Sequence, residues 1–266
     1  MSGFRPCVLI PTYDNPATIG AVVRRARAHW PHVMVVDDGS GPEARAAIDE
    51  LVAAGLCTLE RRAKNGGKGA AVKSGLRAAR ALGYSHALQV DADGQHDLDD
   101  IPRFLAAARA APLDLVLGQP LFDASAPRAR LHGRRISIFW AAVETFGSEV
   151  FDPLCGYRVY PLEAALRAGA RGDRMDFDPE IAVRMIWLGV RVTKLETRVR
   201  YVPRDEGGVS HFQGVRDNVR ISAIHTRLVT EGFGRALLAL ALRLLPGTSA
   251  PALVPAPRWR AKGRER

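Results

Sequence analysis

Short apolar runs alternate with longer amphipathic segments along the first half of the chain. The runs are three to five residues long, as is typical of buried strands, and they lie at 8–10, 33–36, 57–59, 86–90 and 113–117. The amphipathic segments between them begin at proline-containing caps such as Asn15-Pro16 and end at glycines such as Gly55 and Gly83. Strands separated by helices of this length predict an α/β fold: a mainly parallel sheet with helices on both faces.

The second half of the chain is less regular, and it contains no internal repeat. Its pattern predicts two helices, at 131–146 and 178–188, followed by an extended segment at 190–202. Two amphipathic helices are then expected at 215–229 and 235–245. We expect one domain over 1–226 and a basic amphipathic tail over 227–266.

Positive charge is concentrated near the C-terminus. The net charge is +10, and residues 227–266 hold eight Lys or Arg against two Glu, which leaves +4 for the remainder. Such a segment suits an anionic membrane surface, and a solvated terminus is the alternative. A basic nucleic-acid-binding protein is a third interpretation. Because no recognition motif or aromatic platform accompanies the charge, we expect no nucleic acid as a partner.

The expected cellular location of the protein rests on cysteine spacing and on the lack of long apolar stretches in the sequence. Three widely spaced cysteines without a Cys-x-x-Cys pair are typical of reduced thiols. The first apolar run is too short for a signal peptide, and no apolar stretch reaches the ~18 residues of a membrane span. We therefore expect a cytoplasmic protein, peripheral at the cytoplasmic face of the membrane.

Two carboxylates, Asp91 and Asp93, flank Ala92 directly after the fourth apolar run. Ligands bind at the carboxyl ends of parallel strands, and Asp38 ends the second run, so both acidic groups are expected at one rim of the sheet. Such carboxylates can share a divalent cation that prefers oxygen ligands, and Gln95 could supply a third oxygen. An acidic turn is the alternative interpretation.

Six motifs follow one another in a specific order, at 10–15, 35–40, 65–69, 91–95, 152–158 and 177–180. Together they resemble the family 2 inverting glycosyltransferases with the GT-A fold, over about residues 6–212. The most similar branch contains dolichyl-phosphate mannosyltransferase and the bacterial polyprenyl-phosphate glycosyltransferases. The resemblance implies an enzyme that moves a sugar from a GDP- or UDP-sugar to a lipid-linked acceptor such as polyprenyl phosphate.

The resemblance also implies a donor site. The residues expected to bind the base, ribose and phosphates are Pro11, Tyr13, Asn15, Val36, Asp38, Lys68, Asp91 and Ala92. Asn15 replaces the Glu that is usual in the branch. Mg²⁺ or Mn²⁺ is expected on Asp91, Asp93 and Gln95, where it would neutralise charge on the leaving diphosphate. The glycine-rich segment 65–69 would let backbone N–H groups approach an anion at a helix start.

The acceptor side departs from the branch. Pro120 stands where the branch has a phosphate-binding Arg, and either Arg134 or Arg135 matches a second such Arg. A late Arg…Ser-Lys element is represented by Arg204, with His211 in place of the Lys. These differences leave a hydroxyl acceptor open as the alternative to a lipid phosphate.

The two acceptors need different catalytic groups. A phosphate is already anionic, whereas a hydroxyl requires a general base. Asp152 is the candidate base, although Asp-Pro also commonly starts a turn. The residues expected to act on the reacting groups are Asp93, Asp152, Arg134, Arg135 and Arg204.

Overall fold

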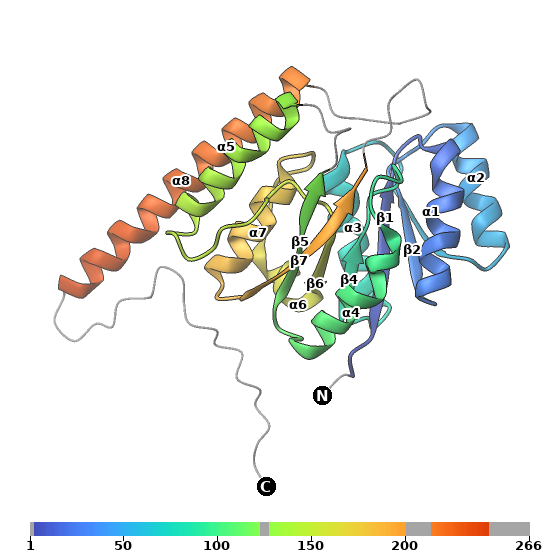
Figure 1. The fold of residues 1–266 in the computed structure, drawn as a ribbon, viewed down its shortest axis with the longest axis horizontal. Helices are drawn as coiled ribbons and strands as arrows, with labels where there is room; N and C mark the ends of the chain where they lie inside the picture. The colour runs from blue at the N-terminus through green and yellow to red at the C-terminus, as the bar shows by residue number, and fades with distance from the viewer. Residues whose placement is uncertain (1–2, 123–127, 201–213, 245–266) are drawn as a thin grey trace, which may run out of the picture.

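The computed structural model describes residues 3–122, 128–200 and 214–244. Within them, seven strands form one sheet in the order β3-β2-β1-β4-β6-β5-β7 (Figure 1). The strands are β1 (Pro6–Thr12), β2 (Val33–Asp37), β3 (Thr58–Arg61), β4 (His86–Gln89), β5 (Leu115–Phe122), β6 (Arg158–Pro161) and β7 (Val192–Val199). The helices are α1 (Pro16–His29), α2 (Pro42–Ala53), α3 (Lys68–Ala81), α4 (Ile101–Ala110), α5 (Arg128–Glu144), α6 (Leu162–Ala168), α7 (Phe177–Trp187) and α8 (Gly214–Leu244).

The sheet is mainly parallel, as the sequence predicts. Strands β1 to β4 pair in parallel, and β5 pairs in parallel with β7. The exception is β6, which lies between β4 and β5 and is antiparallel to both. Strand β5 does not end at Leu117 as expected. It continues to Phe122 because β7 pairs with it along its whole length, including Pro120.

Helices cover both faces of the sheet, and the alternation of side chains along β1 shows how. Cys7 and Leu9 face a core formed with α3, α6 and α7, whereas Val8 and Ile10 face a core formed with α1, α2 and α4. Helix α6 has no counterpart among the predicted elements. The carboxyl ends of β1, β2 and β4 meet at one rim, which places the expected acidic motifs together (Figure 1).

The last described element, α8, is one continuous helix instead of the two expected. The predicted boundary between residues 226 and 227 falls inside it. Helix α8 lies beside α5 and continues beyond it (Figure 1). The two are joined where His225 Nδ1 lies 2.7 Å from the buried carboxylate of Glu144. Among the described helices, none is both long enough and apolar enough to cross a membrane.

Candidate functional site

The turn that carries the acidic motif follows β4 and is held by the end of β7. The backbone N–H of Arg200 donates to the carbonyl of Gln95 at 3.0 Å, and His96 bridges to Val199. The N–H of Gln95 donates to Asp93 Oδ1 at 3.0 Å, which closes the turn. Pairing with a strand distant in sequence therefore fixes the turn that bears these carboxylates.

Lys68, the first residue of α3, lies between two carboxylates. Its Nζ is 2.8 Å from Asp91 Oδ1 and 2.9 Å from Asp178 Oδ2, the latter in the first turn of α7. Burial opposes the charged form of Lys68, but Asp178 and Asp91 raise its pKa above the usual value. Burial likewise opposes ionisation of Asp91, yet Lys68 and His96 hold the pKa of that carboxyl below its usual range. This arrangement keeps Lys68 and Asp91 charged.

The backbone of Gly156 packs directly against this ion pair. A Cβ at Gly156 would lie 2.5 Å from Asp91 Oδ2 and 2.7 Å from Lys68 Nζ, closer than real contacts allow. On another side, His96 Nε2 is 3.5 Å from Asp91 Oδ2. Gly156 lies in the motif at 152–158, here called the acceptor loop because the candidate base Asp152 begins it, so this loop is in contact with the acidic motif.

Asp93 has the opposite electrostatic environment. Burial and the neighbouring charge of Asp91 raise its pKa, so this carboxylate would gain from a cation. The described residues contain no group of three His, Cys, Asp or Glu side chains arranged to hold a metal. Two carboxylates and the Gln95 amide nevertheless suit Mg²⁺ or Mn²⁺, since such ions are often held by one or two carboxylates with substrate phosphates completing the shell. The donor set therefore fits a phosphate-completed cation rather than a closed protein cage.

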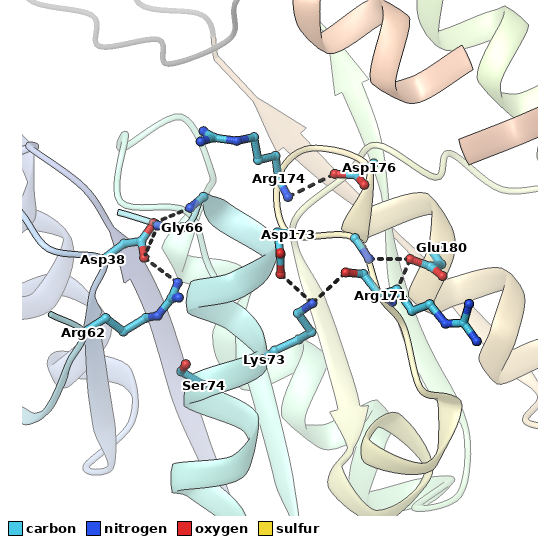
Figure 2. Close-up of polar contacts among 12 residues, drawn as sticks. Asp38, Arg62, Gly66, Lys73, Ser74, Arg171, Asp173, Arg174, Asp176 and Glu180 are labelled. Carbon is cyan, nitrogen blue, oxygen red and sulfur yellow. Dashed lines mark hydrogen bonds and ion pairs between the residues drawn. The ribbon is translucent and has the colours of Figure 1, made fainter. Parts of the chain in front are cut away.

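Asp38, at the end of β2, is buried and organises the glycine-rich segment (Figure 2). Asp38 Oδ2 accepts from the backbone N–H of Gly67 at 2.7 Å and from that of Gly66 at 3.1 Å, and Asp38 Oδ1 accepts from Arg62 Nη1 at 2.6 Å. The N–H groups expected to approach an anion thus reach the Asp38 carboxylate. Contact between Asp38 and a nucleotide base remains a prediction.

The loop after β1 is tied to the loop after β2. The N–H of Gly41 donates to Asp14 Oδ1 at 2.7 Å, and Asn15 Nδ2 donates to the Tyr13 carbonyl at 3.0 Å. Pro11 and Val36 are buried neighbours in the β1–β2 register. The structure therefore gathers the predicted base- and ribose-binding residues at one rim, while Val36 faces the core.

On the acceptor side, Arg134 and Asp152 form a close pair. Arg134 Nε donates to Asp152 Oδ2 at 2.7 Å, and the other oxygen accepts from the N–H of Leu154 at 2.9 Å. Asp152 thus caps the turn, which is the alternative that the Asp-Pro sequence left open. Arg135 is exposed on α5, and Arg204 and His211 lie outside the described residues.

Three neighbours of the site are absent from the residues expected from sequence: Asp178, Gly156 and Arg158. Arg158 is fully buried and donates to the carbonyls of Cys155 at 2.6 Å, Pro153 at 2.6 Å and Asp178 at 2.5 Å. The motifs at 152–158 and 177–180, which contain these residues, can be recognised in the sequence. The contact of Asp178 with Lys68 cannot be predicted from them, because it depends on how α7 packs against α3.

Comparison with known proteins identifies the family. The model of the family described as "Glycosyl transferase family 2" matches residues 7–163. The chain belongs to this family. It is therefore a glycosyltransferase, as the six motifs predicted.

Two relatives of this family 2 glycosyltransferase have names that contain a phosphate-bearing polyprenyl lipid. The polyprenol monophosphomannose synthase of Mycolicibacterium smegmatis is 32% identical over 168 residues, which is 60% of this chain and 62% of that protein. The undecaprenyl-phosphate mannosyltransferase of Micrococcus luteus is 30% identical over 222 residues, 76% of this chain and 86% of the relative. The matched region thus spans less than two thirds of the first of these relatives.

The solved structures give the fold. Glucosyl-3-phosphoglycerate synthase of Mycobacterium tuberculosis, in complex with Mn²⁺, UDP and glucosyl-3-phosphoglycerate, superposes with a TM-score of 0.64. Sequence identity is 17%, and the match covers 86% of this chain and 81% of the other. The family 2 glycosyltransferase has the GT-A fold, as expected from its sequence. Structures of the same synthase also contain Mg²⁺ with UDP.

Proposed function

We propose that this family 2 glycosyltransferase moves a sugar from a nucleotide diphosphate to a polyprenyl phosphate, with inversion and with Mg²⁺ or Mn²⁺. The observation that carries the proposal is the pair of carboxylates, Asp91 and Asp93, at the carboxyl end of β4 beside Lys68. The names of the two lipid-phosphate relatives support the acceptor class.

The roles of the chain's own groups follow from their charges. A divalent cation, when bound by Asp91, Asp93 and Gln95, would neutralise charge developing on the leaving diphosphate. Lys68, at the N-terminus of α3, would add a fixed positive charge and the favourable end of a helix dipole. The donor's sugar carbon would then be open to attack from the side of the acceptor loop.

An anionic acceptor fits the surroundings of Asp152. Both of its carboxylate oxygens accept hydrogen bonds, one from Arg134 and one from the Leu154 N–H. A phosphate nucleophile needs no strong base, and Arg134 is a cation beside the acceptor loop. A hydroxyl acceptor is the second candidate, favoured by Pro120 in place of the branch's phosphate-binding Arg.

Donor binding and acceptor choice can be tested on the purified full-length protein. We expect one class of UDP- or GDP-sugar to raise the Tm only with Mn²⁺ or Mg²⁺ present, and Asp93→Ala to abolish that rise. Sugar transfer should then occur to undecaprenyl phosphate and not to undecaprenol offered side by side. No stabilisation by any donor would contradict the donor assignment, and transfer to undecaprenol alone would establish the hydroxyl alternative.

We further propose attachment to the cytoplasmic face of an anionic membrane. Helices α5 and α8 expose large apolar side chains, namely Ile136, Phe139, Trp140, Phe233, Leu237, Leu238 and Leu240. The segment 227–266 carries +6, and each Lys or Arg near an anionic surface contributes about 1 kcal/mol. Docking through this face would bring the enzyme to a lipid-linked acceptor.

A further inference from the structure

Asp178 is a buried carboxylate to which neither the six-motif resemblance nor the proposed chemistry assigns a role. Its side chain is 5% exposed, and Oδ2 lies 2.9 Å from Lys68 Nζ. Its other oxygen, Oδ1, is buried with no hydrogen-bond partner within the described part of the chain. Burying such a group is costly unless its charge is used, so its single ion pair with Lys68 calls for an explanation.

The fold fixes Asp178 firmly against Lys68. The first turn of α7 packs on the first turn of α3 so closely that a Cβ at Gly69 would lie 2.4 Å from the Cβ of Phe177. Buried Arg158 holds the same turn by donating to the Asp178 carbonyl at 2.5 Å. The carboxylate therefore has little freedom to leave Lys68.

We propose that Asp178 is a positioning residue that shares Lys68 with Asp91 and so keeps Asp91 available to the divalent cation of the donor site. This inference rests on the proposed function. One positive charge on Lys68 can balance only one of the two carboxylates. While Asp178 shares the charge of Lys68, part of the negative charge of Asp91 stays unbalanced. Without Asp178, Lys68 pairs with Asp91 alone and competes with the cation for the same oxygens.

The same arrangement prepares Lys68 for the donor. With a cation on Asp91, Lys68 would stay anchored on Asp178 at the N-terminus of α3, where its positive charge would favour a diphosphate. Asp178 thus acts through Lys68 and has no contact of its own with the reacting atoms.

The test is the Mn²⁺ dependence of nucleotide binding, measured as the Mn²⁺ concentration that gives half of the full Tm rise at saturating nucleoside diphosphate. We expect Asp178→Asn to raise this concentration by about ten-fold, the low end of what outer-shell partners contribute to metal affinity. The matched control is Asp173→Asn. It removes the same charge from the preceding segment, but Asp173 pairs with Lys73, at 2.8 Å, and is exposed.

A second background shows whether Asp178 acts through Lys68. The double variant Lys68→Gln/Asp178→Asn should have a half-maximal Mn²⁺ concentration within two-fold of that of Lys68→Gln alone. A purely structural role of Asp178 would not produce this coupling. Equal effects in both backgrounds, or an effect no larger than that of Asp173→Asn, would overturn the inference. Failure of the unaltered protein to bind any nucleotide with Mn²⁺ would instead overturn the proposed function together with it.

Discussion

Two buried cations at the site, Lys68 and Arg158, are each matched by groups of opposite sign or by carbonyl dipoles. Lys68 has two carboxylates, and Arg158 has three carbonyl oxygens around its guanidinium. Such pairs are held together by the high cost of leaving one partner unpaired in a poorly solvated place. Small displacements here should therefore affect binding and catalysis more than changes on the surface do.

Gly156→Ala tests this sensitivity. The added Cβ would collide with Asp91 Oδ2 and Lys68 Nζ, so the pair must separate or the loop must move. Since a displacement of about 1 Å can cost 10²-fold in rate, we expect a loss of about that size in kcat/KM for sugar transfer. Gly133→Ala on α5 is the control, because a Cβ there meets no atom within 4 Å. Equal activities of the two variants would contradict the tight approach of Gly156.

At the scale of elements, the segment between α6 and α7 connects α3, on the donor side, to α7 (Figure 2). The carbonyl of Asp173 accepts from the N–H of Ala70 at the start of α3, and Lys73 Nζ donates to the Arg171 carbonyl at 2.9 Å. Glu180 of α7 accepts from the N–H of Gly172 at 2.6 Å. One short segment thus joins α3 to α7, and α7 is in turn joined to α8.

Glu180 is the junction of these elements and should be costly to replace. Fully buried, it also accepts from Arg184 at 2.7 Å and from Arg227 of α8. Glu180→Gln removes a fully buried counter-charge from Arg184 and Arg227, although Glu231 still pairs with Arg184. We therefore expect a loss of about 3 kcal/mol in the free energy of unfolding, at the low end for a broken buried pair. Urea denaturation measures it. Glu163→Gln, which breaks only an exposed pair with Arg167, should change that free energy by less than about 0.5 kcal/mol.

The same residue predicts a pH dependence of stability. Burial opposes ionisation of Glu180, but the Gly172 N–H and the neighbouring arginines lower its pKa below 4.5. A lowered pKa in the folded state stabilises the protein above the unfolded-state value and loses that contribution as pH falls through the folded-state value. We therefore expect the difference in unfolding free energy between the unaltered protein and Glu180→Gln to shrink as the pH falls from 7 to below 4.5. A difference that is constant over this range would contradict the ionised state of Glu180.

At the scale of the whole molecule, an acidic rim of the sheet is joined to a pair of helices with exposed apolar side chains. The carboxyl ends of β1, β2 and β4 gather the acidic motifs, whereas α5 and α8 lie side by side farther from β1 and expose apolar side chains (Figure 1). Arg134 lies on α5 and contacts Asp152 in the loop that also carries Gly156. An acceptor held at a membrane by α5 and α8 would therefore be presented to the site along α5.

Membrane attachment can be tested with vesicles. We expect the full-length protein to float with phosphatidylglycerol-containing vesicles, less with phosphatidylcholine alone, and Leu237→Glu to reduce flotation by about ten-fold because it places a charge on the apolar face. Leu82→Glu changes another exposed leucine, at the C-cap of α3 and away from α8, and should leave flotation unchanged. Identical flotation of the two variants would contradict docking through α8.

The sequence alone determined the mainly parallel sheet and the residues at its rim, because these depend on local patterns. Apolar runs identify strands, caps and glycines bound helices, and Asp38, Asp91 and Asp93 follow their strands directly. Only the tertiary structure decided the antiparallel insertion of β6, the continuity of α8 and the partners of each charge. Lys68 meets Asp178 across 110 positions of sequence because α7 packs on α3. Such a contact depends on the packing of distant elements and leaves no periodic signal near either residue.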